Sequence, residues 1–140
     1  MNFQNPGRVM LFLFEVKRFL STKSIREYCE SLDLKGNEKI MEIGSGTGIV
    51  TRYLSRELKR RGKVVCVDTS KALMDVARSN LRDVCNVEFF DGPLQSLNYA
   101  DGSFDAAVIH YMLHDVDPSG REALLRSAFR LLAPKGTVYL

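Results

Sequence analysis

Cysteine is scarce in this sequence. The chain of 140 residues has three cysteines, Cys29, Cys66 and Cys85, which lie far apart from one another. No CxxC pair and no cluster of cysteine with histidine occurs, so neither a zinc site nor a disulfide framework is expected, and no metal is predicted. Unpaired thiols are typical of a reducing compartment, and we therefore expect a cytoplasmic protein.

Long apolar runs and an excess of charge of one sign are also absent. The longest early apolar run covers residues 9–14 and stops at the charged stretch 15–18. It is far shorter than the ~20 residues that span a bilayer, so no membrane insertion is expected. Twenty basic residues against 17 acidic ones leave a net charge of +3, which is too small to argue for a nucleic-acid partner.

From residue 38 onward, short β-branched runs alternate with amphipathic stretches. Strands are predicted at residues 39–43, 64–67, 87–90, 106–109 and 137–140. Strands that alternate with helices and are nearly continuous in apolar residues favour a parallel sheet covered on both faces. We therefore expect a Rossmann-like, doubly wound α/β fold over residues 38–140.

The predicted helices have recognisable ends. The helix that begins at residue 49 is expected to reach a C-terminal cap at Gly62, and Ser70 is expected to cap the next helix. Ser119 and Glu122 have the spacing of a capping box for a helix that Pro134 ends.

Residues 1–37 form a separate N-terminal helical segment, with helices predicted at 9–20 and 24–32. They can pack on the sheet, and they can also serve as a lid over the carboxyl ends of the strands, where ligands bind in such folds. The two roles are compatible.

A glycine-rich turn follows the first predicted strand. Residues 42–48 read Glu-Ile-Gly-Ser-Gly-Thr-Gly. Glycines at a strand-to-helix junction let the backbone approach a ligand closely, and the following helix presents unpaired N–H groups there. The spacing is GxGxG, which differs from the GxGxxG of the dinucleotide fingerprint, and Glu42 stands two residues before the first glycine.

Five segments resemble, in the right order, the motifs of the class I S-adenosylmethionine-dependent methyltransferases. They are residues 32–37 with 42–48, 68–74, 91–92, 104–110 and 131–136. The resemblance runs from about Leu32 to the last residue. It implies S-adenosylmethionine as cofactor, and the apolar N-terminal segment favours a small acceptor, as in the similar quinone-biosynthesis methyltransferases.

The resemblance also implies which residues bind the cofactor. They are Glu42, Gly44, Ser45, Gly46, Gly48, Asp68, Thr69, Met74, Asp91, Gly92 and His110. Glu42 and the glycine turn would hold the methionine part. Asp68 would accept from the ribose hydroxyls, and Asp91 from the adenine amino group. Met74 and Phe90 would flank the adenine ring. His110 would act through its backbone carbonyl near the amino group of the cofactor.

Several of these residues have a simpler explanation. Asp68 could be an acid favoured by a helix N-terminus, Asp91 begins a common turn sequence, and Met74 could be plain core. His114 and Tyr111 are candidates for a proton acceptor near the methyl group. A neutral histidine has a suitable proton affinity at pH 7.

The predicted function is methyl transfer to an O, N or C atom of a small molecule. Two alternatives stay open: an NAD-binding Rossmann domain and a non-catalytic, methyltransferase-like partner subunit. The basic residues after the turn fall on the polar side of an amphipathic helix, which favours a solvated face over nucleic-acid binding.

In the family that the motifs resemble, the fifth strand is usually followed by a helix and an antiparallel pair of strands. The sequence stops within the fifth strand. We therefore expect that C-terminal strands are missing, either because the chain is a piece of a longer protein or because a partner completes the sheet. The fifth strand would then be an edge that favours a homodimer or another partner.

Overall fold

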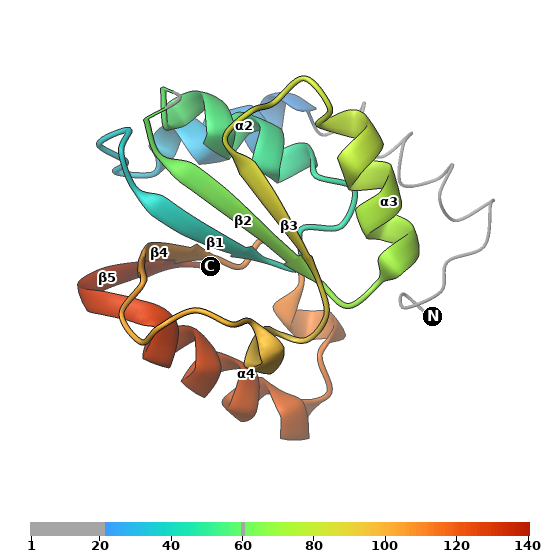
Figure 1. Ribbon diagram of the computed structural model, residues 1–140, viewed down its shortest axis with the longest axis vertical. Coiled ribbons are helices and arrows are strands. Elements are labelled where there is room, and N and C mark those ends of the chain that lie inside the picture. Colours follow the sequence, from blue (N-terminus) through green and yellow to red (C-terminus); the bar gives the residue numbers. More distant parts are fainter. Residues whose placement is uncertain (1–21, 60) are drawn as a thin grey trace.

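The computed structural model describes residues 22–59 and 61–140. Five parallel strands form one sheet in the order β3-β2-β1-β4-β5 (Figure 1). The strands are β1 (Lys39–Ile43), β2 (Lys63–Asp68), β3 (Val87–Asp91), β4 (Phe104–Val108) and β5 (Leu132–Tyr139). The order reverses direction between β1 and β4, which is the topology of a doubly wound α/β sheet. The predicted fold class is confirmed.

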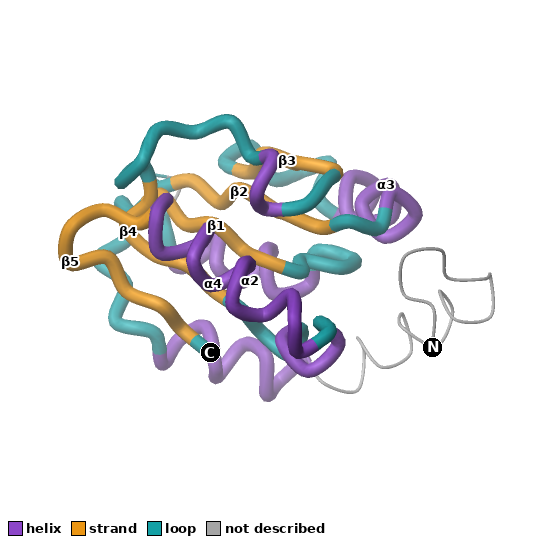
Figure 2. The backbone as a smooth tube through the Cα atoms, turned by 90° about the horizontal axis from the view of Figure 1, so that it is seen from below, coloured by secondary structure: helices purple, strands orange, loops and turns teal. Residues whose placement is uncertain are grey.

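Helices cover both faces of this sheet. One face carries α2 (Ile49–Glu57), α3 (Lys71–Asn80) and the helical residues 22–31, and the other carries α4 (Pro118–Leu131). Figure 2 views the molecule from the side of α4. Among the described residues, no helix has both the length and the apolar composition needed to cross a membrane.

Side chains alternate along each strand between the two faces, and so build two cores. On β1, Ile40 belongs to the core under α2, whereas Met41 and Ile43 belong to the core over α4. β2 repeats the pattern, with Cys66 on the α2 side and Val67 on the α4 side. The same period of two places Glu42 on the α2 side, where it is 2% exposed.

Two helix ends differ from the sequence prediction. The N-cap of α4 is Asp117 and not Ser119, because the Asp117 carboxylate accepts from the Ser119 N–H at 2.9 Å while Pro118 takes the first helical position. α2 ends at Glu57 with Leu58 as its C-cap, and the left-handed residue after the cap is Lys59, with a φ of 48°. Gly62 does not cap the helix. It lies so close to the Glu38 backbone that a Cβ there would overlap it.

The fifth strand begins earlier than residue 137. α4 ends at Leu131, and β5 starts at the next residue, Leu132. Phe104 of β4 pairs with Leu132, whereas Ala106 pairs with Thr137, so the register shifts between these two pairs. A shift of this kind is a bulge, which the alternation of apolar residues does not reveal.

The N-terminal segment is described only from residue 22. The predicted helix over 24–32 is observed at 22–31, and its buried residues Ile25 and Cys29 pack into the core under α2. The predicted helix over 9–20 lies outside the described residues.

Candidate functional site

The predicted site residues meet at the carboxyl edge of the sheet. The glycine turn follows β1, Asp68 ends β2, Asp91 ends β3, and His110 comes shortly after β4. Asp68 and Asp91 are neighbours in the β2–β3 register. The Gly92 N–H donates to the Asp68 carbonyl at 2.9 Å, which joins the ends of these two strands. The fold therefore brings four separate motifs to one edge.

The glycine turn is held against β2 by its own backbone. The N–H groups of Gly44 and Ser45 donate to the Val67 carbonyl at 2.8 and 3.3 Å. Gly44, Gly46 and Gly48 have φ values of 76°, 54° and 80°, a region that L-residues with a side chain rarely adopt. The conformation of the turn therefore depends on its glycines.

The three glycines face different surroundings. A Cβ on Gly44 would overlap the side chain of Met112, and one on Gly48 would press on Leu81 at 2.7 Å. A Cβ on Gly46 would have no described atom within 4 Å. Gly46 is therefore the point of the turn where a ligand can approach the backbone.

Asp68 connects this turn to the start of α3. Its Oδ2 accepts from the Gly46 N–H at 2.8 Å, and its Oδ1 accepts from the Ser70 N–H at 2.8 Å. Ser70 caps α3 as predicted, accepting from the Leu73 N–H at 3.4 Å. Because each carboxylate oxygen can accept more than one hydrogen bond, Asp68 retains capacity for ribose hydroxyls. Thr69, beside it, is exposed.

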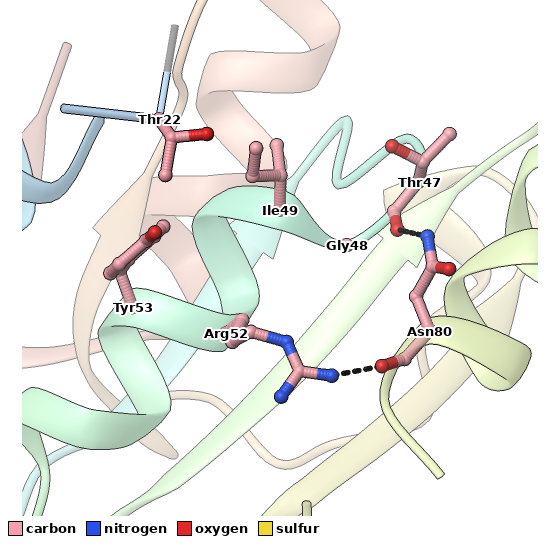
Figure 3. A pocket seen from close by; sticks show the side chains of 7 residues that line it. All are labelled: Thr22, Thr47, Gly48, Ile49, Arg52, Tyr53 and Asn80. Carbon is pink, nitrogen blue, oxygen red and sulfur yellow. Dashed lines mark hydrogen bonds between the residues drawn. The ribbon is translucent and has the colours of Figure 1, made fainter. Parts of the chain in front are cut away.

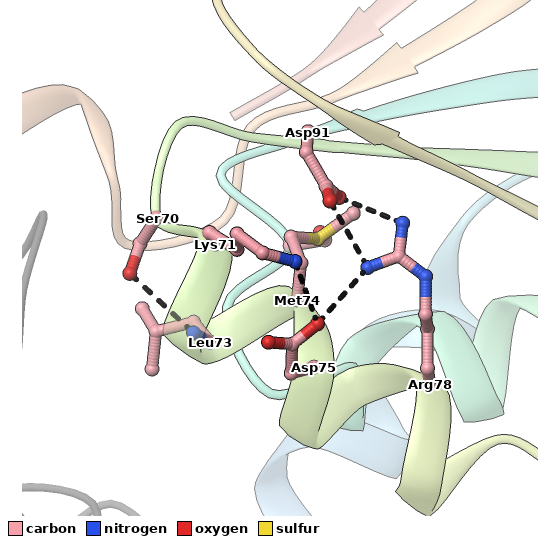
Figure 4. Close-up of polar contacts among 8 residues, drawn as sticks. Ser70, Lys71, Leu73, Met74, Asp75, Arg78 and Asp91 are labelled. Atoms are coloured by element: carbon pink, nitrogen blue, oxygen red, sulfur yellow. Dashed lines mark hydrogen bonds and ion pairs between the residues drawn. The ribbon is translucent and has the colours of Figure 1, made fainter.

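Asp91 has a partner that the sequence did not indicate. The guanidinium of Arg78 donates to both carboxylate oxygens, at 2.8 and 3.1 Å (Figure 4). Arg78 also lies 3.5 Å from Asp75 and stacks over the Phe89 ring. The hydrogen bonds to Asp91 raise the pKa of Arg78. A ligand that hydrogen-bonds to Asp91 must share that carboxylate with Arg78.

Met74 is fully buried in the core under α2. The Ser45 hydroxyl donates to the Met74 sulfur at 3.5 Å, so Met74 contacts the glycine turn from the core. This position accords with the simpler explanation of Met74 as core.

Glu42 is a buried acid with one close hydrogen-bond donor. The Thr51 hydroxyl of α2 donates to its Oε2 at 2.5 Å, and the same hydroxyl lies 3.3 Å from the Cys66 sulfur. Burial raises the pKa of Glu42 to about 8, and the nearby negative charge of Asp68 adds to the rise. A cation at this edge of the sheet would favour the ionised form of Glu42 and would be bound by it.

The aromatic residues after β4 differ in their exposure to solvent. His110 is half-buried, with its ring 4.4 Å from that of Tyr28 and 4.6 Å from that of Tyr111. Burial lowers the pKa of His110, which keeps the imidazole neutral at pH 7. Tyr111 is 80% exposed, and His114 is exposed with its Nε2 3.4 Å from Asp115.

No metal-binding group of three or more acidic, histidine or cysteine side chains occurs among residues 22–59 and 61–140. His110 and His114 do not form such a group with any neighbour there. Tyr28, like Arg78, lies beside the predicted site residues and was missed by sequence reasoning. Its only signal was a place in a helix predicted to reach the carboxyl ends of the strands.

A cavity of about 170 Å³ lies at the far end of the turn (Figure 3). It is lined by Thr22, Thr47, Gly48, Ile49, Arg52, Tyr53 and Asn80. The Asn80 amide donates to the Thr47 carbonyl at 3.0 Å, and Arg52 donates to the Asn80 carbonyl. These contacts tie the turn and α2 to the last residue of α3. Among the predicted site residues, the cavity shares only Gly48.

The chemistry of the site fits the ligand that the motifs imply. A nucleoside with a cationic amino-acid end needs acceptors for its hydroxyls and amino groups, and Glu42, Asp68 and Asp91 supply carboxylates at successive strand ends. Close approach to the backbone is open at Gly46. A buried hydroxyl at Tyr28 has no partner in the described part of the chain.

Comparison with known proteins shows which family the chain resembles. The chain is 33% identical over 106 residues to the ubiquinone/menaquinone biosynthesis C-methyltransferase UbiE of Cronobacter sakazakii, covering 74% of this chain and 41% of that protein. The chain thus spans about two fifths of that relative's length.

Solved structures show the same fold. The YcgJ protein from Bacillus subtilis superposes with a TM-score of 0.69 at 25% identity, covering 81% of this chain and 47% of that one. A SAM-dependent methyltransferase from Aquifex aeolicus gives 0.67 at 21% identity, covering 80% and 57%. A family model described as a methyltransferase domain matches residues 40–136, well over half of the chain. This chain therefore belongs to the methyltransferase domain family, as its motifs predicted.

Proposed function

We propose that the chain is the cofactor-binding part of an S-adenosylmethionine-dependent methyltransferase that acts on a small molecule. The observation that carries the proposal is the contact between the Gly46 N–H and the Asp68 carboxylate, beside a Cβ position that is open to a ligand. It joins the glycine motif and the acidic motif in one site. The family match over residues 40–136 supports the same function.

The residues at the strand ends bind different parts of the cofactor. Asp68 accepts from the ribose hydroxyls, and Asp91 is the acceptor on the adenine side. Glu42 and the backbone carbonyl of His110 serve the cationic methionine end. When bound, the cofactor supplies an activated methyl group on a sulfonium. The chain then mainly has to align donor and acceptor and exclude water, so it needs no elaborate catalytic group.

Proton removal from the acceptor is the one further task. His114 and Tyr111 are our candidates for it, and both are exposed beyond β4. The relative from C. sakazakii is named as a C-methyltransferase of quinone biosynthesis. We infer that this chain serves an acceptor of similar class, a small and partly apolar ring.

Calorimetry with purified protein tests cofactor binding. We expect micromolar affinity for S-adenosylmethionine and S-adenosylhomocysteine, about −8 kcal/mol, and no comparable heat with NAD. Tight binding of NAD alone would favour the dinucleotide-binding alternative. Transfer of labelled methyl over a panel of phenols, amines and ring carbons then identifies the acceptor. Cofactor binding without transfer to any acceptor, also in a longer protein that contains the chain, would favour a partner subunit.

We further propose a homodimer or another partner at β5. This strand is last in the sheet order, so its outer edge has no neighbouring strand among the described residues. Sedimentation shows the mass of the assembly, and a monomer at all concentrations argues against this role.

We also propose that residues 1–37 form a lid over the site. The contact of Tyr28 with His110 supports this proposal. Faster proteolysis of this segment without cofactor than with it is expected.

The cytoplasm is our proposed location, because all three cysteines are free. Cell fractionation that finds the protein in an oxidising compartment would contradict it.

A further inference from the structure

Tyr28 reaches the candidate site from outside the motif-bearing domain. It lies on the helical residues 22–31, which are anchored by the buried side chains of Ile25 and Cys29. The Cys29 thiol also approaches the Val50 carbonyl of α2 at 4.0 Å. The Tyr28 ring packs on His110 at 4.4 Å with an interplanar angle of 32°. The N-terminal helix therefore places one tyrosine beside the carboxyl end of β4.

The hydroxyl of Tyr28 is buried and has no hydrogen-bond partner among the described residues. An unsatisfied buried donor costs about 1–3 kcal/mol, so native proteins seldom keep one without a reason. Burial, together with the nearby groups of Cys29, Glu42 and Tyr139, raises the pKa of Tyr28 to about 12. The hydroxyl therefore keeps its proton at neutral pH and stays available as a donor.

The surroundings of this donor indicate what it can bind. The amino-acid end of the cofactor carries an ammonium group and a carboxylate. Glu42 and the backbone carbonyl of His110 are acceptors, which suit the ammonium but not the carboxylate. A carboxylate needs a donor. The Tyr28 ring packs on the His110 ring, and its hydroxyl has no partner in the described chain.

We propose that the Tyr28 hydroxyl donates a hydrogen bond to the carboxylate of the cofactor's methionine part. This inference rests on the proposed function. It assigns to the N-terminal helix a direct share in cofactor binding, and it explains why a buried hydroxyl is kept without a protein partner.

The test compares two ligands on two variants. S-adenosylhomocysteine carries the amino-acid end, whereas 5′-methylthioadenosine has the same nucleoside and thioether without it. Tyr28→Phe removes only the hydroxyl and keeps the ring against His110. A hydrogen bond to a charged group corresponds to about a 10- to 100-fold change in affinity. We expect that loss for S-adenosylhomocysteine and less than about a twofold change for 5′-methylthioadenosine, measured by calorimetry.

Tyr99→Phe is the matched control. It removes a hydroxyl that donates to Glu88 on β3, away from the site, and should leave both affinities unchanged. Equal binding of S-adenosylhomocysteine by Tyr28→Phe and the parent overturns the inference and leaves the proposed function intact. An equal loss for both ligands also overturns it, because the hydroxyl would then act on the fold. If the parent binds neither ligand, the proposed function itself fails.

Discussion

Replacing Glu42 by glutamine should stabilise the fold and weaken cofactor binding at the same time. Glu42 is 2% exposed, and it lies on β1 between Cys66 of β2 and Val108 of β4. Glutamine has nearly the same shape and keeps an oxygen that can accept from Thr51, but it never ionises. The substitution therefore removes the charge, and the amide N–H groups that it adds act alike at every pH.

The magnitude follows from the raised pKa of Glu42, about 8 in the folded chain against 4.5 normally. Between these two pH values the folded chain holds a proton that the unfolded chain has lost, so the free energy of unfolding falls as pH rises. Below about pH 4.5 both states are protonated and the effect vanishes. Each unit of pKa is about 1.4 kcal/mol, so above pH 8 the penalty is on the order of 3–5 kcal/mol.

Urea unfolding of the parent and of Glu42→Gln between about pH 5 and pH 8 measures this effect. We expect the free energy of unfolding of the variant, relative to that of the parent, to increase steadily across this range. The difference should reach roughly 3–5 kcal/mol at the upper end. Glu122→Gln, an exposed site on α4, is the control and should give a pH curve parallel to that of the parent. Calorimetry at pH 8 should show Glu42→Gln binding S-adenosylmethionine at least about tenfold more weakly, because the ionised carboxylate faces a cation. Stability curves that stay parallel for Glu42→Gln and the parent would refute the reasoning.

Substitutions at three other positions test the rest of the site. Asp68→Ala removes the acceptor of two backbone N–H groups, so it should lower the free energy of unfolding by about 1–3 kcal/mol. It should also weaken cofactor binding about tenfold or more, and Asp68→Asn should fall between Asp68→Ala and the parent. Unchanged affinity would show that Asp68 is a purely structural residue. Gly46→Ala should lower the free energy of unfolding in urea by only about 1–2 kcal/mol, because φ is 54° there but the added Cβ meets no described atom. It should nevertheless abolish measurable cofactor binding. Normal binding would contradict the close approach of the ligand at this position. Arg78→Ala breaks a surface ion pair with Asp91 and should change stability by less than about 1 kcal/mol in the same assay. Its cofactor affinity should stay equal or rise because Asp91 is freed, and a clear loss would show that the guanidinium itself contacts the ligand.

The sequence by itself determined the order of elements and the family. Strand and helix periods are local properties, and a parallel sheet buried on both faces leaves near-continuous apolar strands that can be read directly. The acid before the glycine turn and the acid ending β2 were equally visible. Parallel strands bring such residues to one edge whatever the details of packing, so the location of the site followed from the fold class.

Helix ends and the start of β5 were less predictable. Ser70 was a correct N-cap, but Asp117 displaced Ser119 because the adjacent proline suits the first helical position. Lys59 took a left-handed conformation at the end of α2, and Gly62 was needed instead for contact with the Glu38 backbone. Several residues nearby could fulfil each of these tasks, and only the packed chain selected among them.

Only the tertiary structure decided which side chains meet within the site. The pairing of Arg78 with Asp91 depends on how α3 lies along β3, and the contact of Tyr28 with His110 depends on where the N-terminal helix docks. Neither contact can be predicted from the spacing of residues in a motif, because the two partners are far apart in the sequence and only packing brings them together. The raised pKa of Glu42 has the same origin, since burial between two neighbouring strands and α2 creates it. A motif names a carboxylate, but its charge is set by the low-dielectric surroundings that the folded chain builds around it.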